Sequence, residues 1–211
     1  MSTYVVFDLE MCNVPKGNAR EQFKSGKELI QIGAVAMNES FEIIDSFSTY
    51  VKPEFGRIDS FIRRLTGITS KNVANAPTSE VALRSFYDWL PNDTVLVTWS
   101  GHDVMQIRRE LKFKSIDICG FYDYLDESID CQVVFSKKML TKSAYKLSEA
   151  LLISNIDYNE SLHDALIDAK NTALLFAKTQ KEKELILSPY YIKGEDYLKR
   201  CCDSFSSFSY V

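Results

Sequence analysis

Residues 4–13 read YVVFDLEMCN, a short apolar run followed by two carboxylates, Asp8 and Glu10. Alternate side chains of a β-strand point to the same face, so both acids project together if the strand continues through them. Neighbouring carboxylates repel each other, and a hard divalent cation such as Mg²⁺ or Mn²⁺ removes that repulsion. The alternative is that the strand ends at Phe7 and the acids are solvated loop residues. The stretch alone leaves both interpretations open.

Composition excludes several classes of protein. The chain has 211 residues, 45% of them hydrophobic, which is enough for one sizeable core. The net charge of −4 indicates no global basic field, so a phosphate ligand would need local basic patches or metal ions. Five cysteines without a C-x-x-C pattern and only two histidines argue against structural zinc and indicate free thiols. No signal-peptide pattern and no apolar run of about 18 residues is present, so we expect a cytoplasmic protein without a membrane partner.

The order of periodic segments predicts an α/β fold with a mixed sheet. The first strand is expected over about residues 3–9, and residues 28–37 and 41–53 predict an antiparallel hairpin because a short polar turn joins them. Residues 93–101 predict a further, central strand. Helices, one of them preceded by a short strand, are expected over 59–69, 78–90, 103–113, 128–139, 144–153 and 163–180.

A third acid, Asp103, follows the strand predicted over 93–101 and lies at or just before the start of a helix. If that strand neighbours the first one, Asp103 comes to the same end of the sheet as Asp8, where ligands of open α/β sheets gather. The structural alternative is a helix-terminal acid that interacts favourably with the helix dipole.

The segment SLHDALIDAKNTALL, residues 161–175, carries a fourth acid. His163 precedes Asp168 by five residues, which turn a regular helix by about 140°, so we expect His163 on the connecting loop or the first turn. Ser161 and Asp164 fit a capping-box pattern, which accounts for Asp164 but not for Asp168. A surface role is the alternative for His163. Each of the three motifs is weak alone, and their combination in this order indicates a metal site.

In this order the motifs FDLEMCN, TWSGHDVMQIRREL and HDALIDAKNTALLF resemble the three motifs of the DEDDh 3′-to-5′ exonucleases. The resemblance covers about residues 3–180 and is strongest to the histone-mRNA and sporulation-inhibitor-type branch. It implies a ribonuclease H-like three-layer sandwich with a mixed, about five-stranded central sheet. It also implies an exonuclease domain over residues 1–180, followed by a C-terminal helical appendage and tail over 181–211.

The resemblance assigns roles residue by residue. It implies a general base, His163, and four metal-binding carboxylates, Asp8, Glu10, Asp103 and Asp168. Two Mg²⁺ or Mn²⁺ ions would be the cofactors for hydrolysis at the 3′ end of single-stranded RNA or DNA, with RNA favoured. The terminal nucleotide is expected to contact Met11, Leu65, Thr66 and Trp99.

Other functions stay open at this stage. A non-catalytic module of the same fold would bind nucleic acid or a protein partner, although such modules usually lose a catalytic residue and this chain keeps all five. A proofreading subunit would dock to a polymerase, and the C-terminal segment is where we expect such a partner or a homodimer contact. We expect His102 to be structural, and Asp130 to be structural or to support the metal ligands. The pattern does not choose between RNA and DNA.

Overall fold

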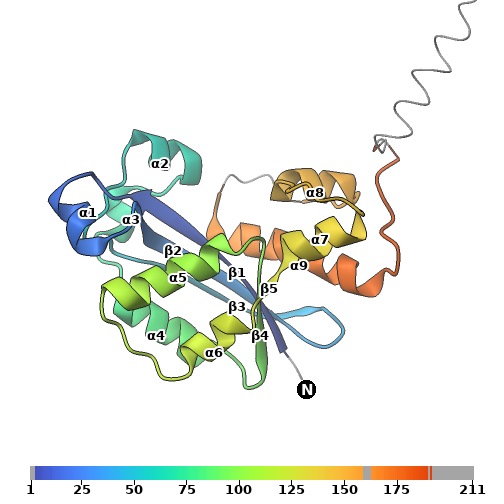
Figure 1. The fold of residues 1–211 in the computed structure, drawn as a ribbon, viewed down its shortest axis with the longest axis horizontal. Coiled ribbons are helices and arrows are strands. Elements are labelled where there is room, and N and C mark those ends of the chain that lie inside the picture. Colours follow the sequence, from blue (N-terminus) through green and yellow to red (C-terminus); the bar gives the residue numbers. More distant parts are fainter. Residues whose placement is uncertain (1–2, 159–162, 190, 192–211) are drawn as a thin grey trace, which may run out of the picture.

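The computed structural model describes residues 3–158, 163–189 and 191. Within these residues the chain forms one mixed five-stranded sheet in the order β3-β2-β1-β4-β5 (Figure 1). Strand β1 is antiparallel to β2 and parallel to β4, and β2 and β3 form the predicted hairpin. The strands are β1 (Thr3–Asn13), β2 (Lys27–Met37), β3 (Ile43–Tyr50), β4 (Thr94–Thr98) and β5 (Ile129–Asp130).

Helices cover both faces of the sheet, so the fold is the predicted three-layer α/β sandwich (Figure 1). On one face, Phe7 of β1 packs in the main core with three helices, α4 (Ser79–Trp89), α5 (His102–Phe113) and α6 (Phe121–Asp126). On the other face, Val6 packs with α7 (Cys131–Lys138) and α9 (Ala165–Lys181). The other helices are α1 (Asn18–Phe23), α2 (Ser60–Thr66), α3 (Ser70–Val73) and α8 (Leu147–Ile153).

Strand β1 is longer than its sequence predicts, because it continues to Asn13 instead of ending near Leu9. Pairing with β2 extends it, and a bulge between Glu10 and Met11 shifts the register at this point. The acids of the opening motif are therefore strand residues. The alternative interpretation, in which the strand ends at Phe7, is wrong.

Three short helices, α1, α3 and α6, do not appear in the sequence pattern. In α1 only Phe23 is buried, and it stacks on Phe55 with ring centroids 5.4 Å apart. A single apolar residue creates no helical period, so this helix depends on a contact with a distant segment.

After α9, residues 182–189 pack back against α7 and α8. The Ser188 N–H donates to the carbonyl of Ile153 at 2.7 Å, and the Lys138 ammonium donates to the carbonyl of Glu182 at 2.5 Å. The helical appendage predicted within 181–211 falls almost wholly outside the described residues and stays a prediction. None of the helices in the described part of the chain is both long and apolar enough to cross a membrane.

Candidate active site

Side chains alternate between the two faces of the sheet along β1, and this keeps the acids out of the main core. Leu9 packs on the face covered by α4 and α5, while Asp8 and Glu10 lie on the face over which α9 begins. Glu10 is only 7% exposed, and Asp8 is partly exposed. The strand thus presents two carboxylates side by side at the end of the sheet, as the sequence predicts.

Parallel pairing of β1 with β4 brings Asp103 to the same place. The chain leaves β4 at Thr98, and α5 begins at His102, so Asp103 lies in the first turn of the helix. Asp103 is 6% exposed, and its carboxylate accepts the backbone N–H of Leu9. The connection before Asp103 is anchored by Asp130, which accepts the N–H of Gly101 at 3.0 Å and caps α7, so Asp130 is structural, which is one of the two roles expected for it.

Helix α9 starts in direct contact with β2. The Gln31 amide donates to the Asp164 carboxylate at 3.1 Å and accepts the N–H of Ala165 at 3.3 Å. At Gly33 the approach is so close that a Cβ atom would lie 2.1 Å from the backbone nitrogen of Leu166. This contact places Asp168, one turn into α9, opposite Glu10 of β1.

The start of α9 differs in one detail from the predicted capping box. Asp164 is itself the N-cap and accepts the N–H groups of Leu166 and Ile167, whereas Ser161 lies outside the described residues. Asp164 therefore has a structural role, as expected, but the predicted capping box that begins at Ser161 is wrong, because Asp164 itself is the N-cap.

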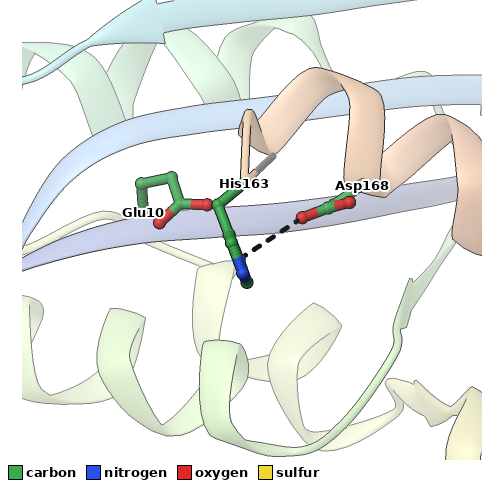
Figure 2. A group of neighbouring side chains, drawn as sticks. All are labelled: Glu10, His163 and Asp168. Atoms are coloured by element: carbon green, nitrogen blue, oxygen red, sulfur yellow. Dashed lines mark ion pairs between the residues drawn. The ribbon is translucent and has the colours of Figure 1, made fainter. Parts of the chain in front are cut away.

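His163 lies on the connection before α9, as predicted, and not on the helix (Figure 2). Its φ of 41° is a left-handed conformation that histidine adopts more readily than most residues. The imidazole is 49% exposed, and its Nδ1 lies 4.0 Å from Oδ2 of Asp168. One ligand atom from each of Glu10, His163 and Asp168 lies within 4.8 Å of the others.

Burial raises the pKa values of all four carboxyl groups, and neighbouring carboxylates raise them further. Burial is the largest cause in each case, and it raises the pKa of Glu10 to about 8 and that of Asp103 to about 7. The pKa of Asp8 is raised well above its usual range by burial and then by Asp103 and Asp168, and the pKa of Asp168 is also raised by burial. Crowded oxygen donors of this kind fit hard divalent cations, whose charge would allow all four groups to ionise.

These acids open onto a cleft of about 980 Å³. Met11 and Trp99, two of the residues expected to contact substrate, line it. Leu65 and Thr66 are not among its lining residues; Thr66 is buried, and its hydroxyl donates to the Ile62 carbonyl within α2. Helix α2 packs against Cys12, near the C-terminal end of β1, and does not line the cleft. Of the four residues expected to contact the terminal nucleotide, the structure therefore places two in the cleft.

Several cleft residues were not expected from the sequence. His102, which we expected to be structural, lines the cleft, and its Nδ1 lies 3.1 Å from the Ser100 hydroxyl. Asn171 also lines the cleft and hydrogen-bonds to Asp168. Its position three residues after Asp168 on a helix was a usable signal, because such residues are neighbours on the helix surface. The wall formed by α7, α8 and their connection carries a run of basic residues within 135–146, a sequence signal for substrate contact, but the pattern did not indicate which of them would line the cleft.

The chain is similar to known proteins over most of its length. The family model described as "Exonuclease" (RNase T) matches residues 5–176. ERI1 exoribonuclease 2 of Danio rerio is 31% identical over 180 residues, which is 74% of this chain and 32% of that protein. A PolC-type DNA polymerase III of Clostridium perfringens is 29% identical over 204 residues, which is 92% of this chain and 12% of that protein. The chain therefore spans less than two thirds of the length of these relatives.

Solved structures share the fold. A full-length 3′-exonuclease superimposes with a TM-score of 0.73 and 25% identity, covering 88% of this chain and 84% of that one. The nuclease domain of 3′hExo, described as a DEDDh family member bound to rAMP, has a TM-score of 0.70 at 24% identity and covers 88% of this chain and 96% of that one. The three-layer sandwich is thus the ribonuclease H-like fold of these exonuclease domains.

Proposed function

Since the chain belongs to the exonuclease family, and to its DEDDh type, we propose that it removes nucleoside 5′-monophosphates from the 3′ end of single-stranded nucleic acid. The observation that carries this proposal is the convergence on one open cleft of four carboxylates, from β1, α5 and α9, and one imidazole, from the connection before α9. These groups are Asp8, Glu10, Asp103, His163 and Asp168.

The carboxylates are the groups that would hold divalent metal ions, and we propose two ions, Mg²⁺ or Mn²⁺. Their oxygen donors and their raised pKa values support this assignment, because uncompensated carboxylates would repel one another at this spacing. Bound ions would supply positive charge at the phosphate and lower the pKa of a water molecule.

His163 is proposed as the general base. An imidazole gains and loses a proton between about pH 5 and 8, which suits proton transfer near neutrality. The half-exposed ring stands on a connection beside Asp168, where it can reach a water in the cleft. In the reaction the water oxygen forms a bond to phosphorus and its proton passes to His163. The bond from phosphorus to the 3′ oxygen of the penultimate nucleotide breaks, and that oxygen takes a proton from solvent water to become the new 3′ hydroxyl.

Two features bear on the choice of substrate and on the alternatives. The 31% identity to ERI1 exoribonuclease 2 favours RNA, while the larger share of this chain matched by PolC-type DNA polymerase III supports proofreading of DNA as a second candidate. A non-catalytic module is disfavoured because all five positions are intact. We assign the reaction to residues 1–180 and propose 181–211 as a segment for contacts with a partner or a second copy.

The proposed function is tested with single-stranded RNA, single-stranded DNA and duplex DNA of one sequence, each radiolabelled at its internucleotide phosphates, with Mg²⁺ or Mn²⁺. We expect mononucleotides to be released from the 3′ end, fastest from RNA per end. Asp8→Ala should reduce release about 10³-fold, since a metal site supplies several kcal/mol of transition-state stabilisation. Asp88→Ala, which changes an exposed acid on α4, is the matched control and should leave the rate unchanged.

Two outcomes would contradict the proposal. One is that no mononucleotide is released from any substrate with either metal ion, and the other is that Asp8→Ala retains full activity. A higher rate on single-stranded DNA than on RNA would favour proofreading as the function.

A further inference from the structure

The cleft is larger than the acids alone require. Its volume of about 980 Å³ lies at the upper end of the range of about 300–1,000 Å³ that accommodates a drug-sized ligand. A nucleoside monophosphate is smaller than the largest ligands of that range, so the cleft has room for more of the strand than its terminal nucleotide. The extra room lies along a wall made by α7, α8 and their connection, which sit beside α9 (Figure 1).

Charge divides the cleft into two parts. Four carboxylates line the end formed by β1, α5 and α9, whereas the α7–α8 wall contributes Lys146. Among the described residues that line the cleft, Lys146 is the one with a lysine or arginine side chain. A polyanionic strand is therefore repelled at one end of the cleft unless cations are bound there, and attracted at the other.

The backbone that carries Lys146 is held against the sheet. The Gln132 N–H donates to the Trp99 carbonyl at 2.8 Å, and the Gln132 side-chain amide donates to the Tyr145 carbonyl at 2.7 Å. The Tyr145 ring packs edge-on against Phe135 with centroids 5.3 Å apart. Gln132 thus links the connection directly before Lys146 to the end of β4, which also delivers Asp103.

The Lys146 side chain is exposed. Its backbone N–H donates to the Glu149 carboxylate at 3.0 Å, but none of the ion pairs among the described residues includes its ammonium group. Lys114 and Lys178, by contrast, are each paired with glutamates. Lys146 forms no ion pair with the four acids, so its ammonium group is available to a phosphate in the cleft.

We propose that Lys146 binds a backbone phosphate on the 5′ side of the scissile bond and so forms a subsite for the strand that remains after cleavage. Lysine suits this role as a flexible point charge that binds phosphate without fixed geometry. The inference rests on the proposed function, and it assigns single-stranded substrate contact to the α7–α8 wall.

Two substrates distinguish an effect on binding at this subsite from an effect on the hydrolytic step. One is a single-stranded oligonucleotide; the other is the p-nitrophenyl ester of thymidine 5′-monophosphate, which has one scissile phosphodiester and no phosphate on its 5′ side. Lys146→Ala should raise the KM for the oligonucleotide about tenfold and leave kcat unchanged, since one charged contact is lost. Hydrolysis of the p-nitrophenyl ester should not change.

The salt dependence gives a second readout. For the oligonucleotide, the slope of log(kcat/KM) against log[salt] should become shallower by about 0.7, the value for one phosphate contact on a single strand. Lys146→Arg should restore both KM and slope. Lys142→Ala is the matched control, because Lys142 is exposed on the same connection but does not line the cleft.

The proposal is overturned if Lys146→Ala leaves the oligonucleotide KM and salt slope unchanged, or impairs both substrates equally. It is also overturned if Lys142→Ala has the same effect, because the positive charge of the connection would then attract the strand without a specific contact at Lys146. If the wild-type protein hydrolyses neither substrate, the proposed function fails. In that case the affinity for the oligonucleotide, measured by fluorescence anisotropy in the presence of Ca²⁺, tests Lys146 separately. The same variants, Lys146→Ala, Lys146→Arg and Lys142→Ala, are compared.

Discussion

Asp8 and Glu10 occupy equivalent positions on one strand but have different surroundings. Glu10 is nearly covered, with 7% of its surface exposed, while Asp8 is only partly buried. Both have raised pKa values for the same reasons, which are burial first and the neighbouring carboxylates second. The strand thus makes the two acids equal partners in the proposed metal site.

We predict that Glu10→Gln and Asp8→Asn will each reduce kcat by about 10³-fold, because each removes one charged ligand and keeps the side-chain shape. Steady-state kinetics at saturating Mn²⁺ measure this effect, with Glu39→Gln, an exposed glutamate, as the control. The metal-free melting temperature should not fall in either variant, since a repulsive buried charge is removed. A Glu10→Gln enzyme that kept more than about a tenth of wild-type kcat would exclude Glu10 from the site.

At the scale of elements, the contact between β2 and α9 sets the geometry of the site. Gln31 bridges the two elements through both atoms of its amide, and Gly33 allows the close approach. His163 and Asp168 both belong to the segment anchored by this contact. Their distance from Glu10 therefore depends on a residue that is not itself charged.

We predict that Gln31→Leu will lower kcat by about 10–100-fold with little change in KM, the usual range for residues that orient metal ligands. Leucine keeps much of the volume but loses both hydrogen bonds. Gln106→Leu is the matched control, because Gln106 is also buried and bonds to the Lys27 carbonyl and Glu110, away from α9.

Urea denaturation should show that the free energy of unfolding falls by a similar amount in both glutamine variants, about 1–3 kcal/mol each. If the Gln106→Leu protein lost as much kcat as the Gln31→Leu protein, the effect would reflect stability alone and the positioning role would be refuted.

At the scale of the whole molecule, the acidic site opposes folding when no cation is bound. The pKa of Glu10 rises from 4.5 to about 8 and that of Asp103 from 3.8 to about 7 on folding. At a pH between the unfolded and the folded pKa of each group, the folded state holds protons that the unfolded state has released. The free energy of unfolding must therefore fall as pH rises through this window.

We predict that the metal-free protein will lose stability steadily between about pH 4 and 8, and that Mn²⁺ will raise its melting temperature more at about pH 8 than at about pH 5. At the lower pH the ions must displace bound protons, which weakens their binding. Scanning calorimetry with and without Mn²⁺ measures both effects. Equal stabilisation at the two pH values, or stabilisation that persists in Asp8→Asn and Glu10→Gln, would show that the ions bind elsewhere.

The parts of the fold that were predictable depend on local chemistry. Gly67 ends α2 with a φ of 72°, and the Thr78 side chain caps α4, as their residue types indicate. The extension of β1 to Asn13 and the helix around Phe23 were missed, because each depends on a segment that is distant in sequence. For the same reason, the sequence pattern did not show which lysine of the basic run 135–146 lines the cleft.

By itself the sequence determined which groups are candidates for the site, because the alternation of side chains along a strand places Asp8 and Glu10 on one face and the five-residue step separates His163 from the face of Asp168. Only the tertiary structure decided that these groups meet. Parallel pairing of β1 with β4 brings in Asp103, and the contact of α9 with β2 brings in Asp168. Such distances depend on packing between segments far apart in the chain, which no local pattern encodes.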